Sequence, residues 1–159
     1  MRRHPAFQDL SRDHFVALNH VVKARRVADE DRLAEPLADV WRGFLRLWRE
    51  LEPHFDEEEE NLRTVIHERR PAMAVRLDDE HGRLRAAFAA MAARDEPDVG
   101  LLWNTAQALR VHIRWEEEQL FEALQEALSS DELEQLAARS RQWRLACRGP
   151  ASVGTGRPV

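Results

Sequence analysis

The stretch LLWNTAQALRVHIRWEEEQLFEA, residues 101–123, repeats one kind of side chain at steps of three and four residues, which is the period of an α-helix. The stripe consists of Leu102, Thr105, Leu109, His112, Glu116, Leu120 and Ala123. A histidine and a glutamate thus lie four residues apart on a mainly apolar stripe. Four residues advance an α-helix by about 400° and roughly 6 Å, so both side chains can reach one point in the interior.

Three further stretches place one histidine on a stripe of the same kind. They are residues 7–21 with His14, residues 40–65 with His54 and residues 77–88 with His81. The stretch 40–65 also carries Glu58 four residues after His54, the same offset as between His112 and Glu116. The repetition predicts four long helices, each with a histidine directed at the core.

Prolines and capping residues predict the ends of these helices. The expected boundaries are a first helix that ends before residues 28–36, a second that begins near Pro36, a third after a break near Pro71 and a fourth that begins near Asp98 and continues to about Leu128. Ser129 and Glu132 have the spacing of a capping box, which predicts a fifth helix to about Ala146. Long helices with short connections pack antiparallel by preference. We therefore predict an all-α fold: an antiparallel up-down four-helix bundle with a short C-terminal fifth helix.

Length and composition favour one globular domain. A chain of 159 residues, 43% hydrophobic and 33% charged, is long enough for one sizeable core. We expect the domain to span residues 1–147. Residues 148–159 are small, polar and rich in Gly and Pro, which predicts a disordered tail.

Charge and hydropathy argue against nucleic acid and membranes as partners. The formal net charge is −5 and no Lys/Arg cluster stands apart from acidic residues, so there is no footprint for nucleic acid. No apolar run approaches the roughly 20 residues that span a bilayer, and the first ten residues lack the apolar stretch of a secretory signal. A single cysteine, Cys147, excludes an internal disulfide. We expect a cytoplasmic protein.

Glutamates on the predicted core stripes need a partner of opposite charge. A buried carboxylate without one costs several kcal/mol or becomes protonated. Apart from Arg85, one turn after His81, no Lys or Arg shares these stripes near the histidines, so a metal cation is the expected counter-charge. Imidazole suits zinc, copper, iron and nickel, and a carboxylate can bridge two hard cations about 3.5–4 Å apart. A mixed set of histidines with two carboxylates fits two irons best.

The predicted metal ligands are His14, His54, Glu58, His81, His112 and Glu116. The natural division gives one ion the first two histidines and the other ion the last two, with both glutamates as bridges. Open positions then remain on both ions. Three other histidines, His4, His20 and His67, lie off the core stripes and are not predicted ligands.

Acidic residues beside the predicted ligands are expected to face solvent. These are Glu57, Glu59 and Glu60 on the second helix and Glu117 and Glu118 on the fourth. Glu50, one turn before His54, is a candidate acceptor for an imidazole N–H, although exposure at the surface is at least an equal expectation.

Other classes of metal-binding or helical protein fit less well. A ferritin-like di-iron enzyme should show Glu-x-x-His pairs, but leucines, Leu51 and Leu109, occupy the required positions. A zinc hydrolase should show HExxH, which does not occur in the sequence. A metal-free interaction module would leave the two glutamates on the core stripes unexplained.

Four motifs in order resemble the hemerythrin-like (HHE cation-binding) family. They are LSRDH (10–14), HFDEEEENL (54–62), DDEHGRLRAAF (78–88) and HIRWEEEQLF (112–121), and the resemblance covers about residues 10–128. It implies an antiparallel four-helix bundle around a non-haem di-iron centre with an oxo or hydroxo bridge, able to bind dioxygen. The six predicted ligands occupy the positions that match the ligands of this family.

The sequence departs from oxygen-carrying hemerythrins on the third and fourth helices. Such carriers typically have two histidines one turn apart on the third helix, whereas Leu77 and Arg85 flank His81 here. They also have an Asp five residues after the fourth-helix histidine, whereas this chain has Glu116 at four. We therefore consider two alternative functions: binding or sensing of dioxygen, and di-iron redox activity on peroxide, nitric oxide or iron. A protein partner or a homodimer is left open.

Overall fold

The computed structural model describes residues 3–147, and every regular element among them is helical. The elements are α1 (Pro5–Ala28), α2 (Leu37–Asn61), α3 (Arg63–Arg69), α4 (Pro71–Ala92), α5 (Val99–Trp115), the π-helix η1 (Glu116–Leu120), α6 (Phe121–Ala127) and α7 (Ser130–Cys147). The prediction of an all-α fold is confirmed. The predicted tail, 148–159, lies outside the described residues.

The capping residues identified in the sequence start two helices. The Asp98 side chain accepts a hydrogen bond of 2.8 Å from the backbone N–H of Leu101, so α5 begins where expected. Before α7, the Ser129 backbone N–H donates to Glu132 and the Glu132 N–H donates to the Ser129 hydroxyl, at 2.8 and 3.3 Å. This reciprocal pair is the predicted capping box.

The second and fourth predicted helices are each interrupted. The second ends at Asn61 rather than continuing to Val65, because Leu62 adopts φ −105° and ψ −32° and a separate α3 follows. The fourth passes through η1, whose Phe121 N–H donates to the Glu116 carbonyl, five residues back. The extra residue in that turn moves the buried stripe from the predicted Ala123 to Leu124.

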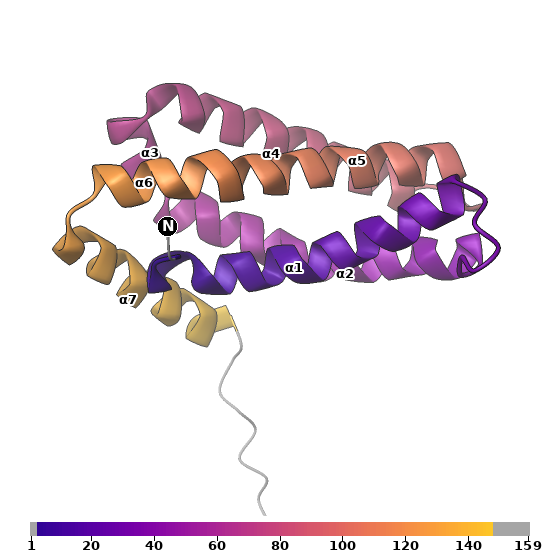
Figure 1. Ribbon diagram of the computed structural model, residues 1–159, viewed down its shortest axis with the longest axis horizontal. Helices are drawn as coiled ribbons and strands as arrows, with labels where there is room; N and C mark the ends of the chain where they lie inside the picture. Colours follow the sequence, from indigo (N-terminus) through magenta and orange to yellow (C-terminus); the bar gives the residue numbers. More distant parts are fainter. Residues whose placement is uncertain (1–2, 148–159) are drawn as a thin grey trace, which may run out of the picture.

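Four long segments lie side by side along the length of the molecule (Figure 1). α1 packs against α2 and α5, and α4 also packs against α2 and α5, so the four segments enclose one interior. α7 crosses one end of the molecule and packs on α1 and α2.

The interior is divided into two apolar clusters. One contains Phe44, Leu84, Phe88, Leu102 and Leu109 among others, and the second contains Phe7, Leu62, Leu77, Phe121 and Leu124 among others. On each long segment the predicted metal ligands lie between residues of the first cluster and residues of the second. The ligands therefore form a polar layer between two hydrophobic halves of the core.

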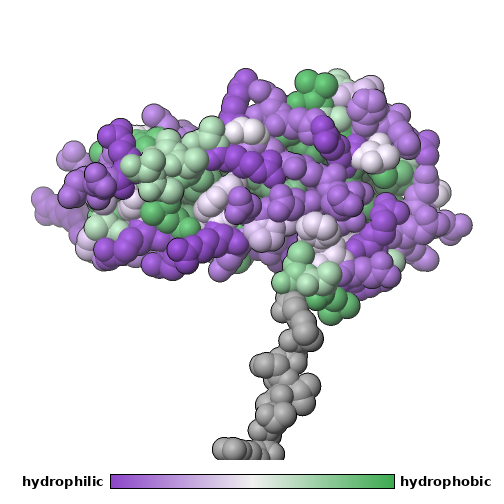
Figure 2. Space-filling model, turned by 180° about the vertical axis from the view of Figure 1, so that it is seen from behind, coloured by the Kyte–Doolittle hydropathy of each residue, from purple (hydrophilic) through white to green (hydrophobic). Residues whose placement is uncertain are grey.

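Hydrophilic residues dominate one face of the molecule. Figure 2 shows them over most of the face opposite to that of Figure 1, with hydrophobic residues in smaller areas. Among residues 3–147, no helix combines the length and the apolar character that crossing a membrane requires.

Candidate metal centre

The six predicted ligands meet in the polar layer. All are buried, with exposed fractions of 0–3%. Their ligand atoms form two groups of four, and within each group the atoms lie within 4.8 Å of one another. The first group is His14, His54, Glu58 and Glu116, and the second is Glu58, His81, His112 and Glu116. The two glutamates belong to both groups, which is the division predicted from the sequence.

All four imidazoles direct Nε2 toward the glutamates. His14 Nε2 lies 3.1 Å from Glu116 Oε2, and His112 Nε2 lies 3.4 Å from the same oxygen. Glu58 spans the two groups, with Oε1 3.4 Å from His54 Nε2 and Oε2 3.3 Å from His81 Nε2. Each carboxylate therefore faces a histidine of both groups.

These separations fit ligands that share a metal ion. Two ligand atoms at right angles on one ion, with bonds of about 2.1 Å, lie roughly 3 Å apart. His14 Nε2 and His54 Nε2 are 3.1 Å apart, and the nearest nitrogen–oxygen pairs are 3.1–3.4 Å apart. The donor set is one in which iron, zinc and manganese are all chemically acceptable.

The outer edge of each imidazole contacts a carboxylate. The four Nδ1 contacts are His14 to Glu117 at 2.8 Å, His54 to Asp13 at 3.2 Å, His81 to Glu59 at 2.8 Å and His112 to Glu80 at 2.9 Å. An ionised carboxylate can only accept, so Nδ1 carries the proton and donates it. A neutral ring then presents its Nε2 lone pair to the centre, as metal-bound histidines do.

These carboxylates correct two predictions. Glu59 and Glu117 were expected on the surface, but each contacts an imidazole. Glu50, for which exposure was at least an equal expectation, is exposed, and the acceptor for His54 is Asp13. In a bundle, the position next to a core residue faces a neighbouring helix rather than water. Glu57, also expected on the surface, is only 3% exposed because it contacts Ser140 of α7.

The four carboxylates share a position in the sequence. Each is adjacent to a predicted ligand along the chain, and each accepts a hydrogen bond from a histidine on the next long segment. In chain order, the pairs are Asp13 of α1 with His54 of α2, Glu59 of α2 with His81 of α4, Glu80 of α4 with His112 of α5, and Glu117 of η1 with His14 of α1. We call these four residues the carboxylate ring.

The buried glutamates set the electrostatics of the layer. None of the four carboxylate oxygens of Glu58 and Glu116 has a hydrogen-bond partner within the described residues. Burial would raise the pKa of Glu58, but the nearby charges of His54 and His81 hold that pKa well below its usual value. Burial would lower the pKa of His54, whereas Glu58 and Asp13 raise it to about 10. The layer thus attracts positive charge, which a metal cation would supply.

The π-helix lies at the site itself. It begins at Glu116, which is a predicted ligand, and it contains Glu117 of the carboxylate ring. π-helical turns are rare and occur often at functional sites. No sequence signal used above predicts this turn.

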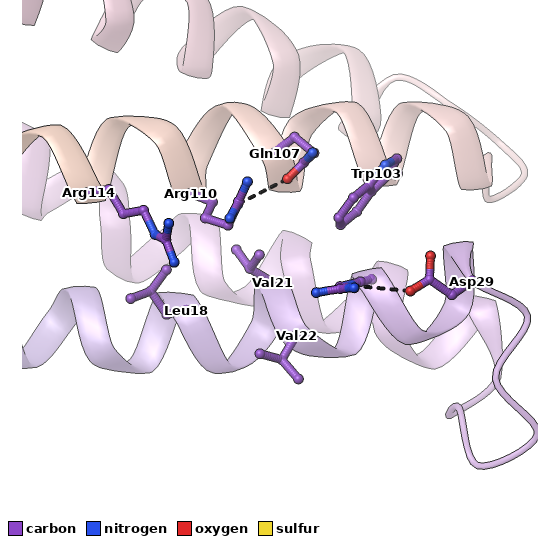
Figure 3. A pocket seen from close by; sticks show the side chains of 9 residues that line it. Leu18, Val21, Val22, Asp29, Trp103, Gln107, Arg110 and Arg114 are labelled. Carbon is purple, nitrogen blue, oxygen red and sulfur yellow. Dashed lines mark hydrogen bonds and ion pairs between the residues drawn. The ribbon is translucent and has the colours of Figure 1, made fainter.

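Two of the surface hollows among the described residues differ in their relation to the predicted ligands. One, of about 540 Å³, lies between α1 and α5 and is lined by Leu18, Trp103, Arg110 and Arg114 among others, but by none of the six predicted ligands (Figure 3). A second, of about 360 Å³, is lined by His54 together with Asp13, Glu57 and Arg144, so it lies on the side of the imidazole where Nδ1 is held.

Comparisons of the chain with protein-family models, with curated proteins and with solved structures gave no match.

Proposed function

We propose that this chain is a hemerythrin-like domain, an antiparallel up-down four-helix bundle that binds two iron ions and, through them, dioxygen. The observation that carries the proposal is the pair of buried four-ligand groups that share Glu58 and Glu116. In support of the topology, the colours in Figure 1 run in opposite directions along successive long segments. The four motifs occur in the family's order on those segments.

A metal-free layer would be unfavourable in this arrangement. Without a metal, the Nε2 atoms of His14 and His54 lie 3.1 Å apart, so either two lone pairs face each other or a ring must take up a second proton inside the core. The carboxylate oxygens of Glu58 add further negative charge at the same point. Buried polar atoms without partners cost free energy, and two cations would satisfy all of these atoms together.

Each ion would have two imidazoles and two shared carboxylates. His14 and His54 would hold one ion, and His81 and His112 would hold the other. Iron commonly accepts six ligands, so four protein donors leave positions for an exogenous molecule. When bound, the iron pair supplies reversible electron transfer to dioxygen or a similar small molecule.

Redox activity on peroxide, nitric oxide or iron is the second candidate function. The observation that favours it is the absence of a fifth imidazole at the second group. Leu77 is fully buried in the apolar cluster, and Arg85 is held by Glu59 and Asp56 at 2.6 and 3.1 Å. Neither residue would supply a ligand to an ion at His81, so that ion would keep as many open coordination positions as its neighbour.

Metal analysis of the purified protein tests the site. We expect two irons per chain, and depletion of iron in His54→Ala and Glu116→Ala. Matched controls are His67→Ala and Glu118→Ala, which change the same residue types at exposed positions. Full iron content in both ligand variants would disprove the assignment, as would a wild-type protein that binds no metal after anaerobic incubation with Fe²⁺.

Exposure of the reduced, iron-loaded protein to oxygen separates the two functions. A visible spectrum that appears with oxygen and disappears when oxygen is removed supports binding or sensing. Rapid, irreversible oxidation, or consumption of added peroxide, supports the redox function.

A further inference from the structure

Each member of the carboxylate ring is itself held by an arginine. The four contacts are Arg3 Nη2 to Glu117 at 2.7 Å, Arg144 Nη2 to Asp13 at 2.8 Å, Arg85 Nη1 to Glu59 at 2.6 Å and Arg76 Nε to Glu80 at 2.7 Å. The arginines come from the segment before α1, from α4 twice and from α7. Each of the four histidines is thus connected, through its own carboxylate, to a separate guanidinium group.

These arginines are more enclosed than ordinary surface arginines. Their side chains are 20–40% exposed, whereas Arg83, on the same helix as Arg76 and Arg85, is 75% exposed and pairs with Asp79 one turn away. Arg144 also lies 2.8 Å from the buried Glu57.

Three of the guanidinium groups also lie over aromatic rings that contact a predicted metal ligand. Arg85 lies 5.7 Å from the centre of the Phe55 ring, which stacks on His81 at 4.1 Å and 4°. The other two are Arg3 over Phe121, which stacks on His14 at 5.8 Å, and Arg76 over Trp115, which lies 6.2 Å from His112. Each of these three arginines is therefore linked to one histidine in two ways, through a carboxylate and through an aromatic ring.

We propose that Arg3, Arg76, Arg85 and Arg144 are positioning residues of the metal centre, which set its metal affinity and reduction potential through the carboxylate ring. The inference rests on the proposed function, because it concerns how the outer residues tune a bound metal. It concerns residues that the sequence motifs do not contain, apart from Arg85.

The direction of the effect follows from electrostatics. A guanidinium bound to a carboxylate withdraws part of its negative charge and fixes its orientation. The carboxylate then accepts less strongly from the imidazole Nδ1–H, and the imidazole donates less electron density to the metal through Nε2. Removal of the arginine reverses this and also removes a positive charge near the metal. Both effects stabilise the more highly charged ion, so the reduction potential should fall.

Substitutions at Arg85 and Arg144 test the inference, with Arg83→Gln as the matched control. Metal affinity is measured by titrating the metal-free protein with Co²⁺ and following the visible spectrum. The potential is measured on the iron-loaded protein. Loss of the fixed orientation of the carboxylate should weaken Co²⁺ binding in Arg85→Gln and Arg144→Gln by about three- to tenfold, less than the roughly 10–100-fold cost of removing a direct partner of a ligand. Orientation outweighs the loss of the guanidinium charge here, because both arginines are partly exposed and water screens their charge. Both variants should lower the midpoint potential, and Arg83→Gln should change neither quantity.

A lysine at the same position tests whether the charge of the arginine, rather than only its packing, sets the potential. Arg85→Lys keeps a cation beside Glu59, so it should recover most of the potential of the wild type. If Arg144→Gln does not fold, Arg76→Gln, the most exposed of the four, takes its place. A wild type that binds two Co²⁺, together with arginine variants of unchanged affinity and unchanged or raised potential, would overturn the inference and leave the metal site intact. A wild type that binds neither Co²⁺ nor iron would instead remove the proposed function.

Discussion

Glutamate and histidine variants of the metal centre should lose different numbers of ions. Glu58 belongs to both four-ligand groups, whereas His54 belongs to one. We therefore expect Glu58→Gln to impair both ions and His54→Gln to impair one. The two substitutions change side chains of similar burial on the same helix, since both residues are buried and lie one turn apart on α2.

Thermal stability gives the size of this difference. Each ion bound only to the folded state stabilises that state by roughly 2.7 kcal/mol when free metal is held at 100 times Kd. Two ions then contribute roughly 5 kcal/mol. For a chain of this length, 1 kcal/mol moves Tm by about 2–4 °C, so metal should raise Tm of the wild type by roughly 10–20 °C. We expect about half of that rise in His54→Gln and little of it in Glu58→Gln.

The assay combines calorimetric unfolding under argon, with and without Fe²⁺, and metal analysis after gel filtration. His67→Gln, at an exposed position of α3, is the control for the histidine variant. The unfolding of each metal-free variant reports any general damage to the core. Equal ion content and equal Tm shifts in Glu58→Gln and His54→Gln would refute the reasoning, because a shared bridge and a ligand of one ion would then be indistinguishable.

Two further substitutions probe the surroundings of the centre. Glu117→Gln should weaken metal binding by about 10–100-fold, because Glu117 accepts from His14 Nδ1, and Glu118→Gln at the adjacent exposed position should have no effect in the same titration. Leu77→His should place an imidazole one turn before His81 and tighten binding of the second ion. Prolonged persistence of the oxygen-dependent spectrum would accompany it, and an unchanged affinity would show that the buried position cannot reach the metal.

Sequence periodicity predicted the six central residues because residues spaced three or four apart lie on one face of a helix. His54 and Glu58 share such a face with apolar residues, and in a helix that packs on its neighbours that face points to the core. The two elements it missed, the break at Leu62 and the π-helix that begins at Glu116, are local changes in hydrogen bonding. Apolar residues continue across both, so the pattern alone gives no signal of them.

Periodicity failed for the carboxylate ring because it divides a helix into a core face and a solvent face. Glu59 and Glu117 belong to neither face. Each lies beside a core residue and reaches the outer edge of an imidazole on the neighbouring helix. A usable signal was present in the sequence: an acid stands next to a predicted ligand on each long helix, as Asp13 precedes His14 and Glu80 precedes His81.

The carboxylate ring closes only where the last long segment meets the first. Three of its contacts join successive long helices, and the fourth, from Glu117 to His14, joins η1 back to α1. Each imidazole therefore takes its acceptor from a helix other than its own. No pair of helices holds both a complete four-ligand group and the acceptors that orient it, because each group draws ligands from three segments. The six residues and their acceptors thus come together only when all four long segments pack, so a metal bound there would contribute its binding free energy to the free energy of folding.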